Sequence, residues 1–236
     1  GSGELNLVNT LVANNAANAV NGGAIYAFAA SGAALAVNAT NTTIVDNTAV
    51  LGGGLYASNA KVVLNNTILA SNSQDLVLEN GASAKANSSL IGDGEAALES
   101  GSLLVKNSFV GTTNAPIDPK LDASYAPTAA SPALNSGSNE LAVYVDGSAI
   151  EKDVLGQDRF VGYDVDGQIH AVDMGAVESQ NLSSADLTFA EETPALVGKF
   201  GAANGVDLGE FVEGWDVVFD YQFGNYGDSP VFTSFD

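Results

Sequence analysis

The sequence predicts an all-β protein built as a parallel β-helix, a solenoid in which short strands stack coil upon coil. Three observations predict this fold. A segment rich in Asn and Thr recurs along the chain, apolar residues alternate with period two inside each copy, and glycine-rich boxes separate the copies. The chain has 236 residues and is 46% hydrophobic, which is ample for a continuous core.

The recurring segment defines the coils. Taking Thr10, Thr43, Thr67 and Ser89 as equivalent gives spacings of 33, 24 and 22 residues. This period is typical of solenoids, in which a single repeat cannot bury its apolar face alone. The related segments are "ELNLVNTLVANN" (4–15), "NATNTTIVDN" (38–47), "KVVLNNTILASN" (61–72) and the weaker "ANSSLIGDG" (86–94).

Glycine boxes predict the corners of the coils. "GGAIYA" (22–27) returns as "GGGLYA" (52–57), each time after an Asn-rich run. Glycine permits positive φ and close backbone approach, and the following Ile25 or Leu55 can then point inward from a short strand. No Lys follows these glycines and no helix is expected, so a phosphate-binding loop is disfavoured.

Asparagines predict a second kind of corner. We expect Asn14, Asn47 and Asn72 either to adopt the left-handed conformation or to form hydrogen-bonded ladders between coils. The residues leave both alternatives open.

Two resemblances to known families follow from these segments. The pairing of an Asn-rich run with a Gly-Gly-Ala-Ile box resembles the repeats of polymorphic outer-membrane proteins. Four ordered elements follow residue 87: Asp118-Pro119-Lys120-Leu121, Ser131-Pro132-Ala133-Leu134 through Gly137, Asp153 through Arg159, and Asp173-Met174-Gly175-Ala176-Val177-Glu178. In this order they resemble the C-terminal end of choice-of-anchor Q domains, which implies a right-handed β-helix over residues 1–180 and an exported bacterial surface protein.

The end of this first domain is predicted to be an irregular C-terminal cap that covers the open edge of the solenoid. Arg159 is the chain's one arginine, and it lies among several acidic residues. We expect it to be an internal ion-pair anchor, because a guanidinium suits the tying together of irregular loops. The acidic residues are Asp153, Asp158, Asp164, Asp166 and Asp173.

Residues 181–236 are predicted to form a second, partial module. The alternation Val217, Phe219, Tyr221, Phe223 predicts a strand, and "GNYGDS" (224–229) predicts a turn into "PVFTSF". This pattern resembles the start of a cell-adhesion-related (CARDB-type) immunoglobulin-like module. Such a sandwich needs about 100 residues, so the module is expected to be incomplete.

Charge excludes two classes of partner. The formal net charge is −21, from 28 acidic against 7 basic residues, so we expect no nucleic acid partner and no binding to an anionic membrane surface. No apolar run approaches the roughly 18 residues that span a bilayer, so we expect no membrane insertion in this segment. Cysteine is absent, which excludes disulfides and Cys-ligated metals.

Candidate chemistry is sparse, and we expect no enzyme. His170, the one histidine, is interpreted as a solvent-facing or hydrogen-bonded residue of the cap, and Trp215 as core of the aromatic module. "YDVDGQ" places Asp164 and Asp166 before a glycine. An Asp-Gly turn is the favoured interpretation, with calcium kept as the one possible cofactor.

The favoured function is that of a non-catalytic structural or adhesion protein, a β-helical stalk. Its expected location is extracellular, at the bacterial cell surface or outer membrane. Its expected partners are other surface proteins, copies of itself or extracellular polysaccharide. One alternative is a carbohydrate-active or carbohydrate-binding β-helix whose site lies on upstream coils. Another is a surface protein that self-assembles by strand exchange through the C-terminal module.

Overall fold

A computed structural model describes residues 2–18, 20–95, 101–162 and 170–180, together with the backbone of 216–220 and 231–235. The chain divides into two units, Gly1–Ala185 and Asp186–Asp236. The predicted boundary between residues 180 and 181 stays a prediction.

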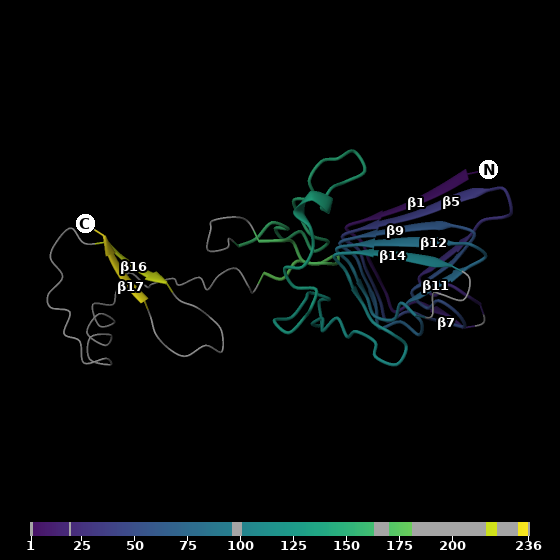
Figure 1. Cartoon of the computed structure of the whole chain (residues 1–236), viewed down its shortest axis with the longest axis horizontal. Helices are drawn as coiled ribbons and strands as arrows, with labels where there is room; N and C mark the ends of the chain where they lie inside the picture. Colours follow the sequence, from purple (N-terminus) through teal and green to yellow (C-terminus); the bar gives the residue numbers. More distant parts are fainter. Residues whose placement is uncertain are drawn as a thin grey trace. The chain divides into compact units, whose positions relative to one another are not determined.

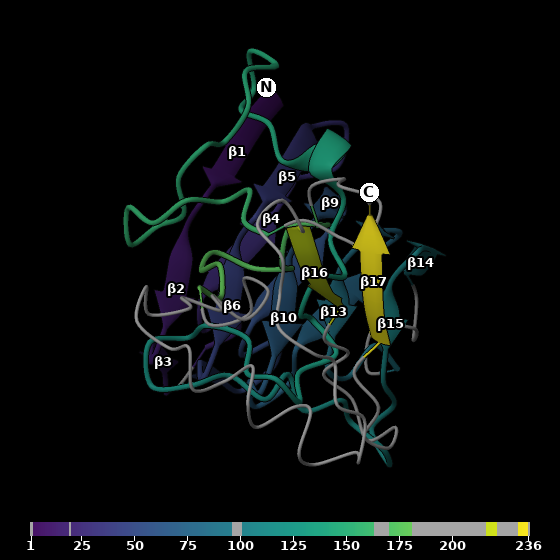
Figure 2. The ribbon, with the colours of Figure 1, turned by 90° about the vertical axis from the view of Figure 1, so that its left-hand side faces the viewer.

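Three parallel sheets build the first unit, and every strand in them pairs with the equivalent strand of the next coil. The first sheet lies in the order β1 (Ser2–Val8), β5 (Ala34–Thr40), β9 (Lys61–Asn65), β12 (Ser83–Asn87) and β14 (Ser102–Lys106) (Figure 1). The second contains β2 (Leu11–Ala13), β6 (Thr43–Val45), β10 (Ile68–Ala70), β13 (Leu90–Ile91) and β15 (Phe109–Val110), which lie side by side in Figure 2. The third contains β4 (Ile25–Phe28), β8 (Leu55–Ser58) and β11 (Leu76–Glu79), and a short parallel pair joins β3 (Ala16–Ala17) to β7 (Thr48–Ala49). The predicted all-β parallel solenoid is therefore confirmed.

The core lies inside the coils, where the three sheets face one another. Period-two alternation sends Val37 and Leu64 inward from the first sheet, Ile44 and Leu69 from the second, and Leu55 from the third. All five side chains are buried, and each buried aliphatic chain of this size stabilises the fold by about 1.5–3 kcal/mol.

The register of the coils differs from the predicted alignment by one residue. Thr43 pairs with Leu11 and Ile68, so it is equivalent to these apolar residues and not to Thr67. The predicted equivalence of Thr43 was wrong because two threonines stand side by side, and only strand pairing distinguishes them. The equivalent positions are Thr10, Thr42, Thr67, Ser89 and Ser108, the last of which belongs to a fifth coil that the alignment missed.

The corners confirm the predicted role of glycine. Gly22 and Gly52 have φ values of 74° and 61°, and a Cβ on Gly22 would lie 2.7 Å from the Ile25 carbonyl oxygen. Ile25 and Leu55 then point into the core.

Both predicted roles of asparagine, the left-handed corner and the hydrogen-bonded ladder, occur in the structure. Asn14 adopts the left-handed conformation, with a φ of 59°, whereas Asn47 and Asn72 form a ladder. A row of left-handed residues that was not predicted turns the chain from the first sheet to the second: Asn9, Asn41, Asn66, Ser88 and Asn107.

The described residues of the next segment, 111–162 and 170–180, are irregular, and we name them the cover. It contains one 3-10 helix, η1 (Asn139–Leu141), and within the described residues no helix is long and apolar enough to cross a membrane. The prediction of an irregular C-terminal segment is confirmed, but its predicted position over the end of the stack was wrong. In Figure 1 the teal and green cover lies beyond one end of the strands of the first sheet, and not beyond β14.

The cover packs on the outer face of the second sheet because that sheet is apolar on both faces. Ile44 and Leu69 point into the solenoid, while Val45 and Ile68 point outward into a second apolar cluster with Met174 of the cover. Sheets that are buried on both faces carry continuous apolar runs, and "ILA" of β10 is such a run. Further cover residues in this cluster are Ile117, Leu121, Tyr125 and Ala133.

In the second unit the structure describes two strands, β16 (Asp216–Asp220) and β17 (Val231–Phe235), which pair antiparallel. The predicted strand from Val217 is confirmed as far as Asp220, and its continuation through Phe223 lies outside the described residues. The immunoglobulin-like character of this unit stays a prediction.

Candidate functional site

The buried guanidinium of Arg159 is the centre of the cover. Arg159 is 0% exposed, and its Nη1 donates to the Gly175 carbonyl at 3.0 Å and to Glu178 Oε2 at 3.3 Å. Its Nη2 donates to the Ala176 carbonyl and to Asn9 Oδ1 of the first coil, both at 2.7 Å. The predicted internal anchor is confirmed, and it links the cover directly to the coils.

Three carboxyl groups surround this guanidinium, and all of them are buried. Glu178 is its direct partner, while Asp173 accepts hydrogen bonds from the backbone of Asn135 and Ser179. Burial raises the pKa of Asp173 to about 6. Burial and the Asp173 carboxylate together raise the pKa of Glu178 to about 9, because they outweigh the attraction of the guanidinium. Asp153, also buried, accepts from the Glu178 backbone N–H at 3.0 Å.

The acidic residues near Arg159 in the sequence have different roles. Asp158 forms an exposed ion pair with Lys152 at 2.6 Å and is not a partner of Arg159. Asp164 and Asp166, the candidate calcium ligands, lie outside the described residues. Among the residues that are described, no group of three or more His, Cys, Asp or Glu side chains could hold a metal ion.

Glu178 was missed as the partner of Arg159. It stands in the terminal Gly-Ala-Val-Glu box, nineteen positions away, and aspartates nearer in the sequence were predicted to surround Arg159 instead. The signal available was the small-residue run Gly175-Ala176, since small side chains let a backbone approach a buried guanidinium. A Cβ on Gly175, whose φ is 103°, would lie 2.6 Å from Thr43 Oγ1.

A polar ladder runs through the coils beside the third sheet. The Asn15 Nδ2 donates to Asn47 Oδ1, Asn47 Nδ2 to Asn72 Oδ1, and Asn72 Nδ2 to Asp75 Oδ1, each at 2.9 Å. Asp75 ends the ladder, and its burial raises the pKa of that carboxyl. Each member satisfies its neighbour, so the ladder holds successive coils in register.

An aromatic cluster on the outer face of the third sheet was also missed. The rings of Tyr26 and Tyr56 stack with centroids 5.2 Å apart, and Phe28 lies beside Tyr26 at 6.4 Å. Tyr56 donates to the Glu79 carboxylate, which raises the pKa of the tyrosine. The repeat carried the signal, because "GGAIYA" and "GGGLYA" put the tyrosines at equivalent positions.

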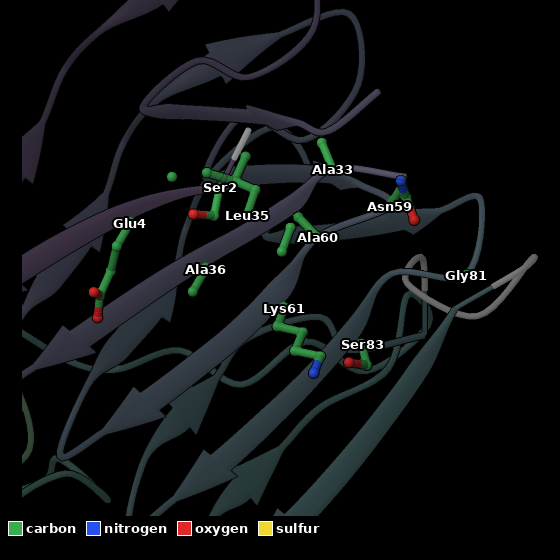
Figure 3. A pocket seen from close by; sticks show the side chains of 12 residues that line it. Ser2, Glu4, Ala33, Leu35, Ala36, Asn59, Ala60, Lys61, Gly81 and Ser83 are labelled. Carbon is green, nitrogen blue, oxygen red and sulfur yellow. The ribbon is translucent and has the colours of Figure 1, made fainter. Parts of the chain in front are cut away.

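A groove crosses the outer face of the first sheet near the beginning of its strands. Its volume is about 660 Å³, within the size range of ligand pockets. Glu4 of β1 and Lys61 of β9 stand on either side of Ala36 of β5, with which both are in register (Figure 3). Ser83 lies beside Lys61, and Ser2 lies near the other end of the groove.

Two residues singled out in the sequence remain, His170 and Trp215. His170 is half-buried, and its backbone carbonyl accepts a hydrogen bond from the Asn139 side chain, so the predicted role of its imidazole stays a prediction. Trp215 lies outside the described residues.

The chain was compared with family models, with curated proteins and with solved structures, and none of them matches it. The strand order shows the architecture of the chain, an all-β parallel solenoid with stacked sheets.

Proposed function

We propose that this chain is a non-catalytic structural module of a bacterial surface or secreted protein, a β-helical stalk that serves adhesion or display. The proposal includes the finer resemblance to choice-of-anchor Q domains and to polymorphic outer-membrane proteins, and with it the extracellular location.

One observation carries the proposal: the four ordered motifs behind the resemblance meet in the cover and hold it together. Ser131 Oγ donates to the Pro119 carbonyl, which joins the second motif to the first. The Met174 N–H donates to the Ala133 carbonyl at 2.9 Å, joining the fourth motif to the second. Arg159 joins the third motif to Glu178 of the fourth. These polar groups are used in folding, as expected for a motif set that builds a scaffold.

The stalk role is supported by the way the coils are joined. Backbone pairing continues from β1 to β14, and the ladder of Asn15, Asn47 and Asn72 repeats the same contact in successive coils. A solenoid of this kind grows by adding coils without changing its cross-section, which suits a spacer.

The location is tested with a cysteine introduced into a chain that has none. Val145 is 76% exposed on the cover, whereas Ile150 nearby is 0% exposed. With Val145→Cys in the source bacterium, we expect a membrane-impermeant maleimide to label intact cells, and Ile150→Cys to remain unlabelled until the protein is denatured. Labelling of Val145→Cys only after cell lysis would overturn the surface proposal.

The absence of catalysis is tested separately. Purified protein is incubated with a panel of neutral and acidic polysaccharides, while new reducing ends and the absorbance of unsaturated sugars are followed. We expect no product above the buffer control. Steady product release by the purified chain would support the carbohydrate-active alternative instead.

A further inference from the structure

The outer face of the first sheet differs in charge from the rest of the protein. Its outward positions alternate with the inward Val37, Val62 and Ala84, and they include Lys61, Lys85 and Lys106. Other outward positions carry Glu4, Asn6, Asn38, Asn65, Ser83, Asn87, Ser102 and Leu104.

Three of the chain's seven cations are therefore gathered on one face of a protein with a net charge of −21. Glu4 is the one acid among the outward positions of the five strands. All three lysines are exposed, and within the described part of the chain none is within 4 Å of a carboxylate. The charges of these lysines are thus available to a partner.

The lysines lie on a diagonal across the sheet. Lys61 is in register with Ser83, Lys85 with Leu104, and Lys106 with Asn87, so each step moves one strand over and two residues along. Strand spacing and rise per residue make each step about 8 Å. An extended polymer laid along this diagonal would meet a positive charge at regular intervals.

The groove includes Lys61, the first lysine of the diagonal. Lys61 forms one wall, Glu4 the other, and the small Ala36 lies between them (Figure 3). Glu4 is held by the Asn38 amide, which donates to its Oε1 at 2.8 Å. These three groups match an acidic sugar. The Lys61 cation suits its carboxylate, the Glu4 acceptor suits its hydroxyl groups, and the small Ala36 suits the apolar face of its ring.

We propose that the outer face of the first sheet binds an acidic polysaccharide, with a uronic acid residue in the groove and its carboxylate on Lys61. Further carboxylates of the polymer pair with Lys85 and Lys106, while Ser and Asn side chains of the face bond to hydroxyl groups. A duplex nucleic acid is less suitable, because it carries one negative charge per about 1.7 Å, more densely than a polymer with one carboxylate per sugar, and the net charge of −21 therefore repels it more strongly.

This inference deepens the proposed function and rests on it in one respect, that the polymer is retained and not cleaved. The test measures binding of the full chain to immobilised polygalacturonate, alginate and neutral dextran at two salt concentrations. We expect binding to the two acidic polymers, weaker at higher salt, and none to dextran.

Charge-matched variants test the site. Lys61→Gln with Lys85→Gln removes two charges from the face, and Lys120→Gln with Lys152→Gln removes two exposed charges from the cover. We expect the first pair to weaken binding at least tenfold and the second to change it less than twofold. Circular dichroism verifies that both fold, which is expected since all four side chains are exposed.

Three results would overturn the proposal: no binding to either acidic polymer, equal losses in the two double variants, or equally tight and equally lysine-dependent binding of single-stranded DNA. The last would indicate a general polyanion surface. None of them would affect the cysteine labelling of intact cells, so failure of this inference is distinguishable from failure of the proposed surface location.

Discussion

The coils and the cover of this protein both bury polar side chains, but the coils repeat their contacts and the cover makes each contact once. In the coils, Asn47 has an equivalent neighbour on either side, Asn15 and Asn72, and the same hydrogen bond recurs. In the cover, one guanidinium joins two carbonyls, a carboxylate and the first coil. Loss of one ladder member leaves its neighbours in place, whereas loss of Arg159 removes the centre of the cover.

The difference teaches how an irregular segment can be added to a solenoid. Repeated backbone pairing needs no particular side chain, so a coil tolerates sequence change at many positions. A cover without strands has to replace that pairing with specific polar contacts, and these concentrate on a few residues. We therefore expect the two regions to respond differently to the changes below.

Arg159→Met should have the largest effect. It removes the cation beside the buried Asp173 carboxylate and the donor to the Glu178 carboxyl, and leaving a buried charge uncompensated in this way costs about 3–5 kcal/mol of unfolding free energy. Hydrogen exchange read by mass spectrometry should show residues 133–178 losing protection, while coil residues 37–91 keep most of theirs.

The matched control is Lys152→Met, which breaks an exposed ion pair worth at most about 1 kcal/mol. Equal loss of protection in coils and cover after Arg159→Met would contradict the division into two kinds of stabilisation.

Asn47→Ala should have an intermediate effect. The Asn47 side chain accepts from the Asn15 backbone and donates to the Val45 carbonyl at 2.8 Å, and its removal leaves buried partners unpaired. We expect a loss of about 2 kcal/mol, measured by urea unfolding. Asn38→Ala, in the exposed row with Glu4 and Asn6, should change stability by less than about 0.5 kcal/mol. A larger effect for Asn38 than for Asn47 would show that the buried ladder does not hold the coils.

The buried carboxyls of the cover should also make the unfolding free energy depend on pH, with a smaller change per pH unit for each carboxyl than the change that either substitution causes. Because burial raises the pKa of Glu178 to about 9 and of Asp173 to about 6, the folded protein binds protons more tightly than the unfolded chain. The contribution of these two carboxyls to stability should be fully present below about pH 4 and be lost as the pH rises toward 9, by at most about 1.4 kcal/mol per pH unit for each carboxyl.

Glu178→Gln tests this origin, because the amide cannot ionise. The variant should show a shallower fall in unfolding free energy between pH 6 and pH 9 than the wild-type protein. Identical slopes in the two proteins would mean that the repulsion of the whole net charge of −21, and not this carboxyl, causes the fall.

The fold and the role of one residue of the cover were predicted from the sequence. The aromatic cluster of the third sheet and the groove of the first sheet were not. Gly22 and Gly52 were correctly predicted as corners, and Arg159 as an internal anchor. The stacked Tyr26 and Tyr56 were overlooked although the repeat placed them at equivalent positions. The groove was not predictable at all, since it depends on Glu4 and Lys61 standing on strands that are not neighbours in the sequence.

By itself the sequence determined the strands, the inward side chains and the glycine corners, because alternation and backbone freedom are local properties that a repeated segment displays several times. Only the tertiary structure decided that Thr42 and not Thr43 matches Thr67, that the cover lies on the side of the second sheet, and that Arg159 reaches Asn9. The physical reason is distance along the chain: the Arg159 and Asn9 side chains are separated by 150 residues, and their meeting depends on the path of every coil between them.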